Sequence, residues 1–383
     1  MKSNIWKYYA FSFLTFFVVF LPYIVYYFQE LGFSLTKIMI ITAIMNVIII
    51  SFEVPSGYFA DKFGRKKSLL FGAVFLIVSA TLLYTQTSYY LFIFAYMFSG
   101  LGIAFISGAD SALIYDTLLD LNKEKEFKKI SGRAGFFKNL ALMSSALLAS
   151  YLVQFGIKYT ILATLIIDVA SLVLILTLKE PKRQDVPPGE DGSIKGILSA
   201  SFKNKDLKGL FIYAFIVLGI QEAIFRFYQP YFRSTGLPLI YFGVAFAFFS
   251  LVAAVSAWYS HKIEEKLGVY RTLIFMPLLM LISSFFSATI FVWYGFMFFF
   301  FREFVRGMIY PVLRDYVNKL VSSHKRATVL SMQNFFASIG GIIITLASAL
   351  ISDNFSVRHT YFFLSGALVV ALIIIIKHLK MRK

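Results

Sequence analysis

The chain has 383 residues, of which 59% are apolar and 15% charged, and Phe alone occurs 45 times. Soluble globular domains are roughly half apolar, so this excess indicates a protein that lies in a membrane. The formal net charge of +17 would suggest a nucleic-acid partner in a soluble chain. The absence of cysteine excludes disulfides and thiolate chemistry.

Apolar stretches of about 20 residues recur along the chain, which is the length that crosses ~30 Å of hydrocarbon as an α-helix. We therefore expect an all-α membrane protein with twelve transmembrane helices. They cover residues 8–28, 35–59, 68–85, 89–119, 129–155, 158–178, 208–232, 237–259, 271–288, 291–316, 327–352 and 357–376. The first span follows Lys2 and Lys7 but is too long for a signal-peptide core and lacks a cleavage site of small residues, so we expect it to be retained.

The basic residues are distributed unequally between the two sides that these spans define. Most of the 37 Lys and Arg residues fall in segments on the side of Met1, and the outer segments hold Lys37, Lys158, Arg233 and Arg358. Short basic loops stay in the cytoplasm, so we predict a cell-membrane protein with both termini cytoplasmic. Topology thus accounts for the charge. The expected partners are the lipid bilayer, a small-molecule substrate and protons, with no nucleic acid, and we expect a monomer.

The loop after the second span, residues 57–67, reads GYFADKFGRKK and combines Gly57, Asp61, Gly64, Arg65 and Lys66. This string resembles the G-x-x-x-D-x-x-G-R-K-x signature of the major facilitator superfamily, in its loop between helices 2 and 3. We take the resemblance to cover the whole chain, with bacterial drug or small-molecule efflux proteins as the similar group. It implies two pseudo-symmetric six-helix bundles and a secondary active transporter that works by alternating access, not an enzyme.

A polar stretch rich in Pro and Gly, residues 179–207, divides the spans into six and six. We therefore expect an N-terminal bundle over 1–178, a cytoplasmic linker over 179–207 and a C-terminal bundle over 208–383. A weak internal repeat at an offset of 204 supports this division. It matches Gly32 with Gly236, Asp61 with Glu265, Gly64 with Gly268 and Lys67 with Arg271.

The resemblance also implies a cytoplasmic gate. In the family, an acid near the inner end of helix 4 pairs with the basic part of the 2–3 loop and closes the cytoplasmic side. Here Asp116 occupies that place, and Arg65 is its expected partner, together with Asp61. Glu53, two residues before Pro55, is a further candidate for this gate.

Ionisable residues inside a span are costly and are functional candidates by default. Glu222 and Arg226 are four residues apart and therefore share one helix face, either as a self-satisfying pair or as part of a site. In the span 291–316, Glu303 can pair with Arg306, which leaves Arg302 without a local partner. Arg302 and Glu222 lie at similar depth and are expected to meet. The three arginines suit a carboxylate or phosphate on a substrate, and a purely structural network is the alternative.

Three further intramembrane charges and two aromatic residues are candidates. Asp110 falls in the middle of the span 89–119 and is an alternative proton carrier facing the cavity. Lys138 and Asp168 are expected to form a structural pair, which requires an extended lysine. Tyr23 and Phe225 are the aromatic residues most expected to line the substrate cavity.

Two departures from the family leave proton coupling and direction open. Tyr96 stands where proton-coupled members carry an arginine, four residues before Gly100, and residues 135–152 lack the Gly-Pro of the antiporter signature. We predict proton-coupled efflux of an amphipathic or anionic solute by antiport, with proton-coupled uptake of an organic anion or sugar as the alternative. A polytopic lipid-acting enzyme is a remote alternative. No cofactor or metal is expected, and the proton gradient is the expected driving force.

Overall fold

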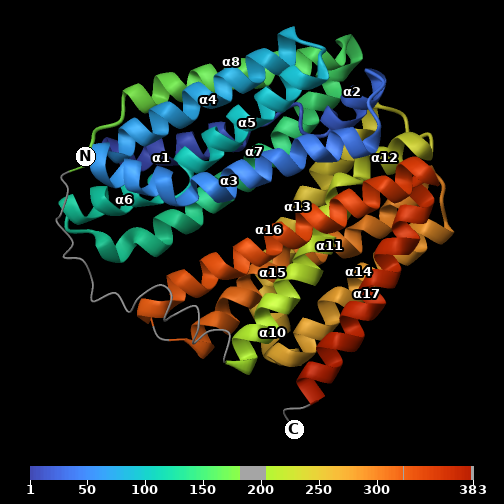
Figure 1. The fold of residues 1–383 in the computed structure, drawn as a ribbon. Coiled ribbons are helices and arrows are strands. Elements are labelled where there is room, and N and C mark those ends of the chain that lie inside the picture. The colour runs from blue at the N-terminus through green and yellow to red at the C-terminus, as the bar shows by residue number, and fades with distance from the viewer. Residues whose placement is uncertain (182–203, 322, 381–383) are drawn as a thin grey trace. The chain divides into compact units, whose positions relative to one another are not determined.

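The computed structural model describes residues 1–181, 204–321 and 323–380, and within them the protein consists of helices without any strand (Figure 1). The all-α fold is therefore confirmed. The contacts divide the chain into two units. Unit 1 comprises Met1–Phe33, Ile40–Pro187 and Leu239–Ala247, and unit 2 comprises Ser34–Met39, Pro188–Pro238 and Phe248–Lys383. Most of the expected linker, 179–207, lies outside the described residues.

Within residues 1–181 the structure has eight α-helices where six spans were expected. They are α1 (Ser3–Phe16), α2 (Ile24–Glu30), α3 (Leu35–Phe63), α4 (Arg65–Thr85), α5 (Tyr89–Ile106), α6 (Ala109–Asp120), α7 (Phe127–Leu152) and α8 (Ile157–Leu176). The first expected span is broken between α1 and α2, and the fourth is broken between α5 and α6 at Gly108, whose φ is +78°. Asp110 was expected in mid-helix and instead lies in the first turn of α6.

The C-terminal half has the same kind of interruptions. Its helices are α10 (Lys205–Tyr213), α11 (Gly219–Arg226), α12 (Tyr228–Ser234), α13 (Ile240–Leu267), α14 (Val269–Thr289), α15 (Phe299–Leu320), α16 (Ser323–Asn354) and α17 (Val357–Lys380). A π-helical segment, Ala214–Leu218, joins α10 to α11. Such segments are rare and often mark functional positions.

Ten helices in the described part of the chain are long and apolar enough to cross a membrane. They correspond to ten of the twelve expected spans. The two others are the broken segment of α1 and α2, and α15, which carries Arg302, Glu303, Arg306, Arg314 and Asp315. The number twelve therefore stays a prediction, because a break or a group of charges removes the uninterrupted apolar run that identifies a span.

The repeat at an offset of 204 has a structural counterpart. Gly32 and Gly236 have φ values of +83° and +75°, and Gly64 and Gly268 have φ values of +117° and +77°. Left-handed backbone of this kind favours glycine because it has no Cβ. Helix α4 begins directly after Gly64 and α14 begins directly after Gly268. The two helices begin and end at positions 204 residues apart. The matched glycines thus mark equivalent turns in the two halves.

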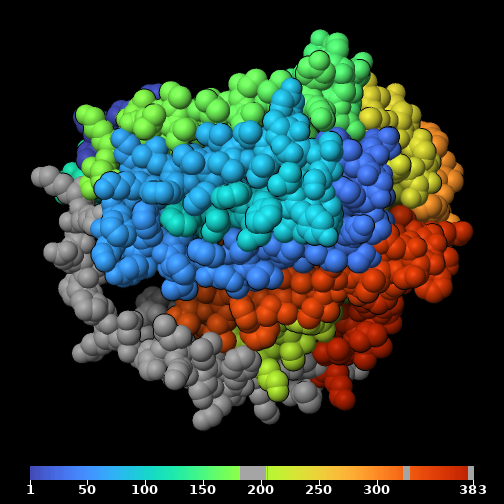
Figure 2. All heavy atoms as spheres, turned by 45° about the horizontal axis from the view of Figure 1, so that its top comes forward, coloured from blue at the N-terminus to red at the C-terminus, as the bar shows by residue number. Residues whose placement is uncertain are grey.

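Large apolar side chains cover outward faces of the helices. In unit 1, α4 and α5 lie side by side (Figure 1), and their side chains form part of a continuous surface (Figure 2). Phe71 and Val74 on α4 and Phe94 on α5 are 47%, 44% and 51% exposed. Contiguous apolar surface of this extent is unfavourable in water, and it suits contact with lipid.

Close packing of glycines fixes α16 against the π-helical segment of unit 2. A Cβ on Gly340 would overlap the carbonyl oxygen of Phe215, and a Cβ on Gly219 would lie 2.7 Å from the Gly340 carbonyl carbon. The neighbouring Gly341 faces Glu222, whose Cγ would lie 3.4 Å from an added Cβ. The two backbones can approach this closely only because no side chain separates them.

We predict that Gly340→Ala destabilises the protein by about 1–3 kcal/mol, because the added methyl group forces the two backbones apart. The matched control is Gly366→Ala on α17, where an added Cβ meets nothing within 4 Å. Thermal unfolding of both variants in detergent measures the effect. Equal unfolding temperatures for the two variants would contradict the close crossing.

Candidate functional site

Three of the expected gate residues form one cluster in unit 1. Arg65, the first residue of α4, pairs with Asp61 at the end of α3, and its Nε lies 3.5 Å from the Asp116 carboxylate on α6. The positive φ of Gly64 turns the chain between α3 and α4 and brings Arg65 back over Asp61. This arrangement links the loop to α6, as the sequence motif predicted. Its gating role stays a prediction.

Glu180 is a member of this cluster that sequence reasoning missed. Its two carboxylate oxygens accept from the backbone N–H groups of Arg65 and Lys66 at 2.6 and 2.8 Å. The first N–H groups of a helix lack intrahelical partners, and a carboxylate satisfies them and matches the helix dipole. Lys66 Nζ also donates to the Leu176 carbonyl at 2.7 Å. The only signal in the sequence was an acid directly before Pro181.

Two other expected gate residues lie apart from these contacts. Glu53 is exposed, and within the described residues its side chain contacts none of the cluster. Gly57 has open space around its Cα, since an added Cβ would meet nothing within 4 Å. The structure therefore brings together Asp61, Arg65 and Asp116 but leaves Glu53 outside.

The matching turn of unit 2 is also connected to another helix by an ion pair, although its members do not lie at the positions that the repeat matches. Glu264, near the end of α13, lies 3.4 Å from Lys319 Nζ on α15, which also pairs with Asp315 at 2.5 Å. In unit 1 the loop supplies the base and α6 supplies the acid. In unit 2, α13 supplies the acid and α15 supplies the base. The repeat in the sequence matched the neighbouring Glu265, and neither Glu264 nor Lys319 was expected to pair.

The intramembrane charges of unit 2 meet around Glu303, which is 1% exposed. Its carboxylate pairs with both Arg302 and Arg306 and accepts from Tyr228 Oη at 2.9 Å. Arg302 is itself 2% exposed and donates to the Gln221 carbonyl at 2.6 Å. The expectation that Arg302 lacks a local partner is wrong, because one carboxylate has two oxygens and serves both guanidinium groups.

Glu222 and Arg226 form the expected pair on α11, with 2.8 Å between the Glu222 carboxylate and an Arg226 guanidinium nitrogen. Glu222 thus contacts Arg226 and not Arg302. The Phe225 ring connects the two sets of charges, since its centroid lies 6.0 Å from the Arg226 guanidinium and 5.5 Å from that of Arg302. The site therefore joins an accessible pair to a buried core of paired charges, in which Arg302 Nε has no hydrogen-bond partner among the described residues.

The remaining candidates lie in unit 1. Lys138 lies 3.5 Å from the Asp110 carboxylate and 4.9 Å from the centre of the Phe16 ring. The expected pairing of Lys138 with Asp168 is therefore wrong, because the break before α6 places Asp110 within reach. Tyr23 is fully buried, and its hydroxyl accepts from the Gly243 N–H at 3.1 Å.

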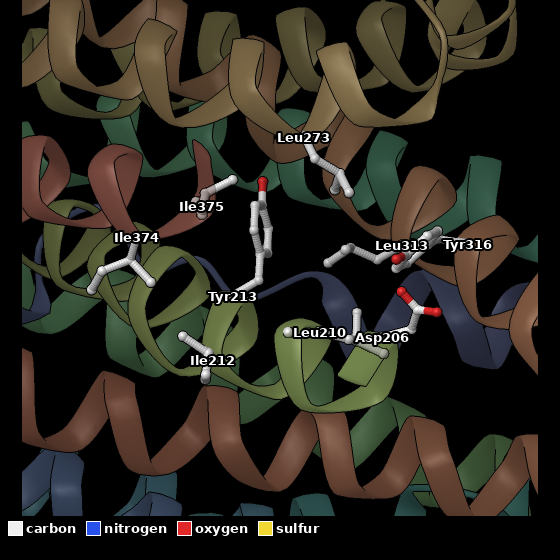
Figure 3. Close-up of a pocket in the computed structure, with 10 residues that line it drawn as sticks. Asp206, Leu210, Ile212, Tyr213, Leu273, Leu313, Tyr316, Ile374 and Ile375 are labelled. Carbon is white, nitrogen blue, oxygen red and sulfur yellow. The ribbon is translucent and has the colours of Figure 1, made fainter. Parts of the chain in front are cut away.

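A small cavity of about 50 Å³ lies apart from these charges in unit 2, between α10, α14, α15 and α17 (Figure 3). Its walls are aliphatic except for Asp206, Tyr213 and Tyr316. This volume holds a few water molecules. None of the charged residues around Glu303 lines the cavity, so we assign it no part in the site.

A helical chain that holds paired charges inside apolar helices has the features of a membrane transporter. A family model described as Major Facilitator Superfamily matches residues 8–345. The chain therefore belongs to the major facilitator superfamily. It is a multi-span membrane transporter for a small molecule and not an enzyme.

One curated relative and several solved structures are similar over almost their whole length. The relative is YxaM of Bacillus subtilis (strain 168), described as an uncharacterized MFS-type transporter, with 22% identity over 365 residues that cover 93% of this chain and 90% of YxaM. The crystal structure of the nucleoside transporter NupG has a TM-score of 0.82 and 14% identity, covering 98% and 99% of the two chains. A D-xylose–proton symporter has a TM-score of 0.72 and 14% identity, covering 97% and 96%. At these identities the solved structures show a shared fold alone.

We predict that Asp61→Asn lowers the transport rate at least tenfold without changing the amount of protein in the membrane, because Arg65 loses the acid that holds it. Glu53→Gln is the control, since Glu53 is exposed and lies outside the cluster. Transport of an identified substrate into proteoliposomes measures both variants. Wild-type turnover in Asp61→Asn would exclude the gating role.

We also predict that Glu180→Ala speeds hydrogen exchange at the first amides of α4, because Arg65 and Lys66 lose the acceptor of their N–H groups. Loss of a helix cap costs about 1 kcal/mol, which corresponds to roughly fivefold faster local opening. Hydrogen-exchange mass spectrometry of the peptide over 65–70 measures it. Unchanged exchange there would contradict the capping role of Glu180.

Proposed function

We propose that this protein is a secondary active transporter in the bacterial plasma membrane that carries a small organic anion together with a proton. The observation that supports this proposal is the charge balance of the site in unit 2. Three guanidinium groups, of Arg226, Arg302 and Arg306, face two carboxylates, of Glu222 and Glu303. When all are ionised, one positive charge is left over, and a substrate anion would balance it.

Accessibility separates the arginines into two roles. Arg302 is 2% exposed, and its two terminal nitrogens contact Glu303 and the Gln221 carbonyl, so it positions the core of the site. Arg226 and Arg306 are 17% and 26% exposed and are the groups that a substrate would contact. A guanidinium group binds a carboxylate or phosphate through two parallel hydrogen bonds.

The pairing of Glu222 with Arg226 determines whether binding of a proton favours or opposes binding of the substrate. A proton on Glu222 neutralises the carboxylate and frees Arg226 to bind a substrate anion. An anion on Arg226 in turn displaces Glu222 and favours its protonation. Each ligand therefore strengthens binding of the other by the same factor, and the two travel together.

Because the proton and the anion strengthen each other's binding, this coupling favours uptake over the efflux that the sequence suggested. Co-transport with protons down their inward gradient moves the anion into the cell. Antiport requires that proton and substrate compete, as a cationic amphiphile would compete with a proton for Glu222. A D-xylose–proton symporter shares the fold, so this helical scaffold serves proton co-transport elsewhere.

The test follows proton movement in proteoliposomes that contain a pH-sensitive dye. Gluconate, p-toluenesulfonate and glucose 6-phosphate are added outside as anions, and ethidium is added as a cationic amphiphile. We expect at least one anion to acidify the interior. Alkalinisation by ethidium, with no response to any anion, would instead indicate export by antiport.

We predict that Glu222→Gln lowers the rate of anion-driven acidification at least tenfold but binds the anion at least as tightly as the wild type, measured as a thermal shift, because the uncharged amide leaves Arg226 free. Arg226→Gln should weaken that binding at least tenfold, since a charge-assisted pair contributes about 1.5–3 kcal/mol. Asp110→Asn tests the alternative proton carrier in unit 1. If Glu222→Gln and Asp110→Asn both move protons as the wild type does, coupling through these acids is wrong.

A further inference from the structure

The first expected span, which belongs to unit 1, is broken between two helices. Helix α1 ends at Phe16 and α2 begins at Ile24, with no helix between them. The Thr164 hydroxyl of α8 accepts from the backbone N–H groups of Val19 and Phe20 at 3.0 and 3.4 Å. Such a break leaves carbonyl groups at the end of α1 without their usual helical partners, although the Leu14 carbonyl accepts from the Phe17 N–H at 3.1 Å. In transporters, carbonyl groups at such breaks coordinate cations.

The register between α1 and α8 shows which residues lie beside this break. Besides the bond from Val19 to Thr164, Lys7 Nζ donates to the Thr177 carbonyl at 2.6 Å. The two helices are thus antiparallel. Each step of one residue towards the start of α1 corresponds to about one residue towards the end of α8. Asp168 comes four residues after Thr164, so it lies level with Thr15 and Phe16, at the end of α1.

Asp168 faces the interior of the unit. It follows Thr164 by four residues and precedes Ser171 by three, and residues with these spacings share one helix face. Thr164 and Ser171 are 3% and 5% exposed. Among the residues that the structure describes, Asp168 has no hydrogen-bond or ion-pair partner, since Lys138 pairs with Asp110.

Two hydroxyl groups of α1 are also without partners, that of Thr15 at the level of Asp168 and that of Ser12 about one helical turn before it. Thr15 Oγ1 and Ser12 Oγ are buried and have no hydrogen-bond partner in the described part of the chain, and Ser12 is 1% exposed. A buried polar atom without a partner is unfavourable. Three unsatisfied oxygen-bearing side chains within about one helical turn of one another therefore indicate a ligand that oxygen atoms coordinate.

We propose that Asp168, Thr15 and Ser12, with the free carbonyl groups at the end of α1, form a binding site for Na⁺. Hard cations prefer carboxylate, hydroxyl and carbonyl oxygens. A single carboxylate neutralises one positive charge, and no group of three acidic, histidine or cysteine side chains suited to a divalent metal occurs among the described residues. This site is separate from the proton site proposed at Glu222 and does not depend on it.

The test is protection of Asp168 from a hydrophobic carbodiimide, which reacts with protonated carboxyl groups in apolar surroundings. The purified full-length protein in detergent is treated at pH 6.5 in choline chloride, and peptides are analysed by mass spectrometry. We expect Asp168 to be modified, NaCl at millimolar concentration to prevent the reaction, and KCl to require at least a tenfold higher concentration.

Matched variants separate coordination from general effects of salt. Thr15→Val should raise the NaCl concentration for half-protection at least tenfold, whereas Thr81→Val, on an exposed position of α4, should leave it unchanged. A thermal shift by NaCl in the wild type, absent from Asp168→Asn, provides a second readout. Labelling that NaCl does not affect would overturn the proposal and leave Asp168 as a neutral acid. Absence of labelling in choline chloride would overturn it as well.

Discussion

One buried carboxylate holds the charged site of unit 2 together. An isolated guanidinium group in an apolar interior is strongly unfavourable, and Arg302 is almost fully buried. Glu303 neutralises it, pairs at the same time with Arg306, and accepts from Tyr228. Since Arg302 also donates to the Gln221 carbonyl, the same network fixes α15 against α11. The position of Glu222 one residue further along α11 is therefore a consequence of this buried core.

Breaks in the helices determine where the other polar groups come to lie. The turn at Gly108 starts α6 and places Asp110 beside Lys138. The interruption after Phe16 exposes backbone groups that Thr164 satisfies in part. The π-helical segment before α11 packs closely on Gly340. A backbone inside a membrane must satisfy its own polar groups, so each break requires polar side chains nearby, and polar side chains in turn collect at breaks.

The sequence predicted the features that depend on local spacing. Four residues between Glu222 and Arg226 suffice to predict their pair, and the motif around Gly64 predicted the contacts of Arg65 with Asp61 and Asp116. It did not predict features that depend on which helices meet. The break after Phe16 contains Pro22 and the break before α6 contains Gly108, but the apolar composition of both spans outweighed these signals and indicated continuous helices. Some partners are distant in sequence, such as Lys138 for Asp110 and Glu180 for the first turn of α4. These contacts depend on how the helices pack, which the spacing of residues along the sequence does not predict.

Both halves connect this turn to another helix by an ion pair, but at positions that the repeat does not match. Arg65 lies at the start of α4 and pairs with Asp116 on α6, whereas Glu264 lies near the end of α13 and pairs with Lys319 on α15. Attraction between two opposite charges does not depend on which helix carries which charge, so a contact of this kind forms from different positions in the two halves. A comparison of residue identities detects the glycines, because only glycine suits their backbone, and it overlooks the lysine. The backbone conformation at the glycines therefore shows the repeat more clearly than the charged residues do. A charged residue in one half must be compared with the other half together with its partner.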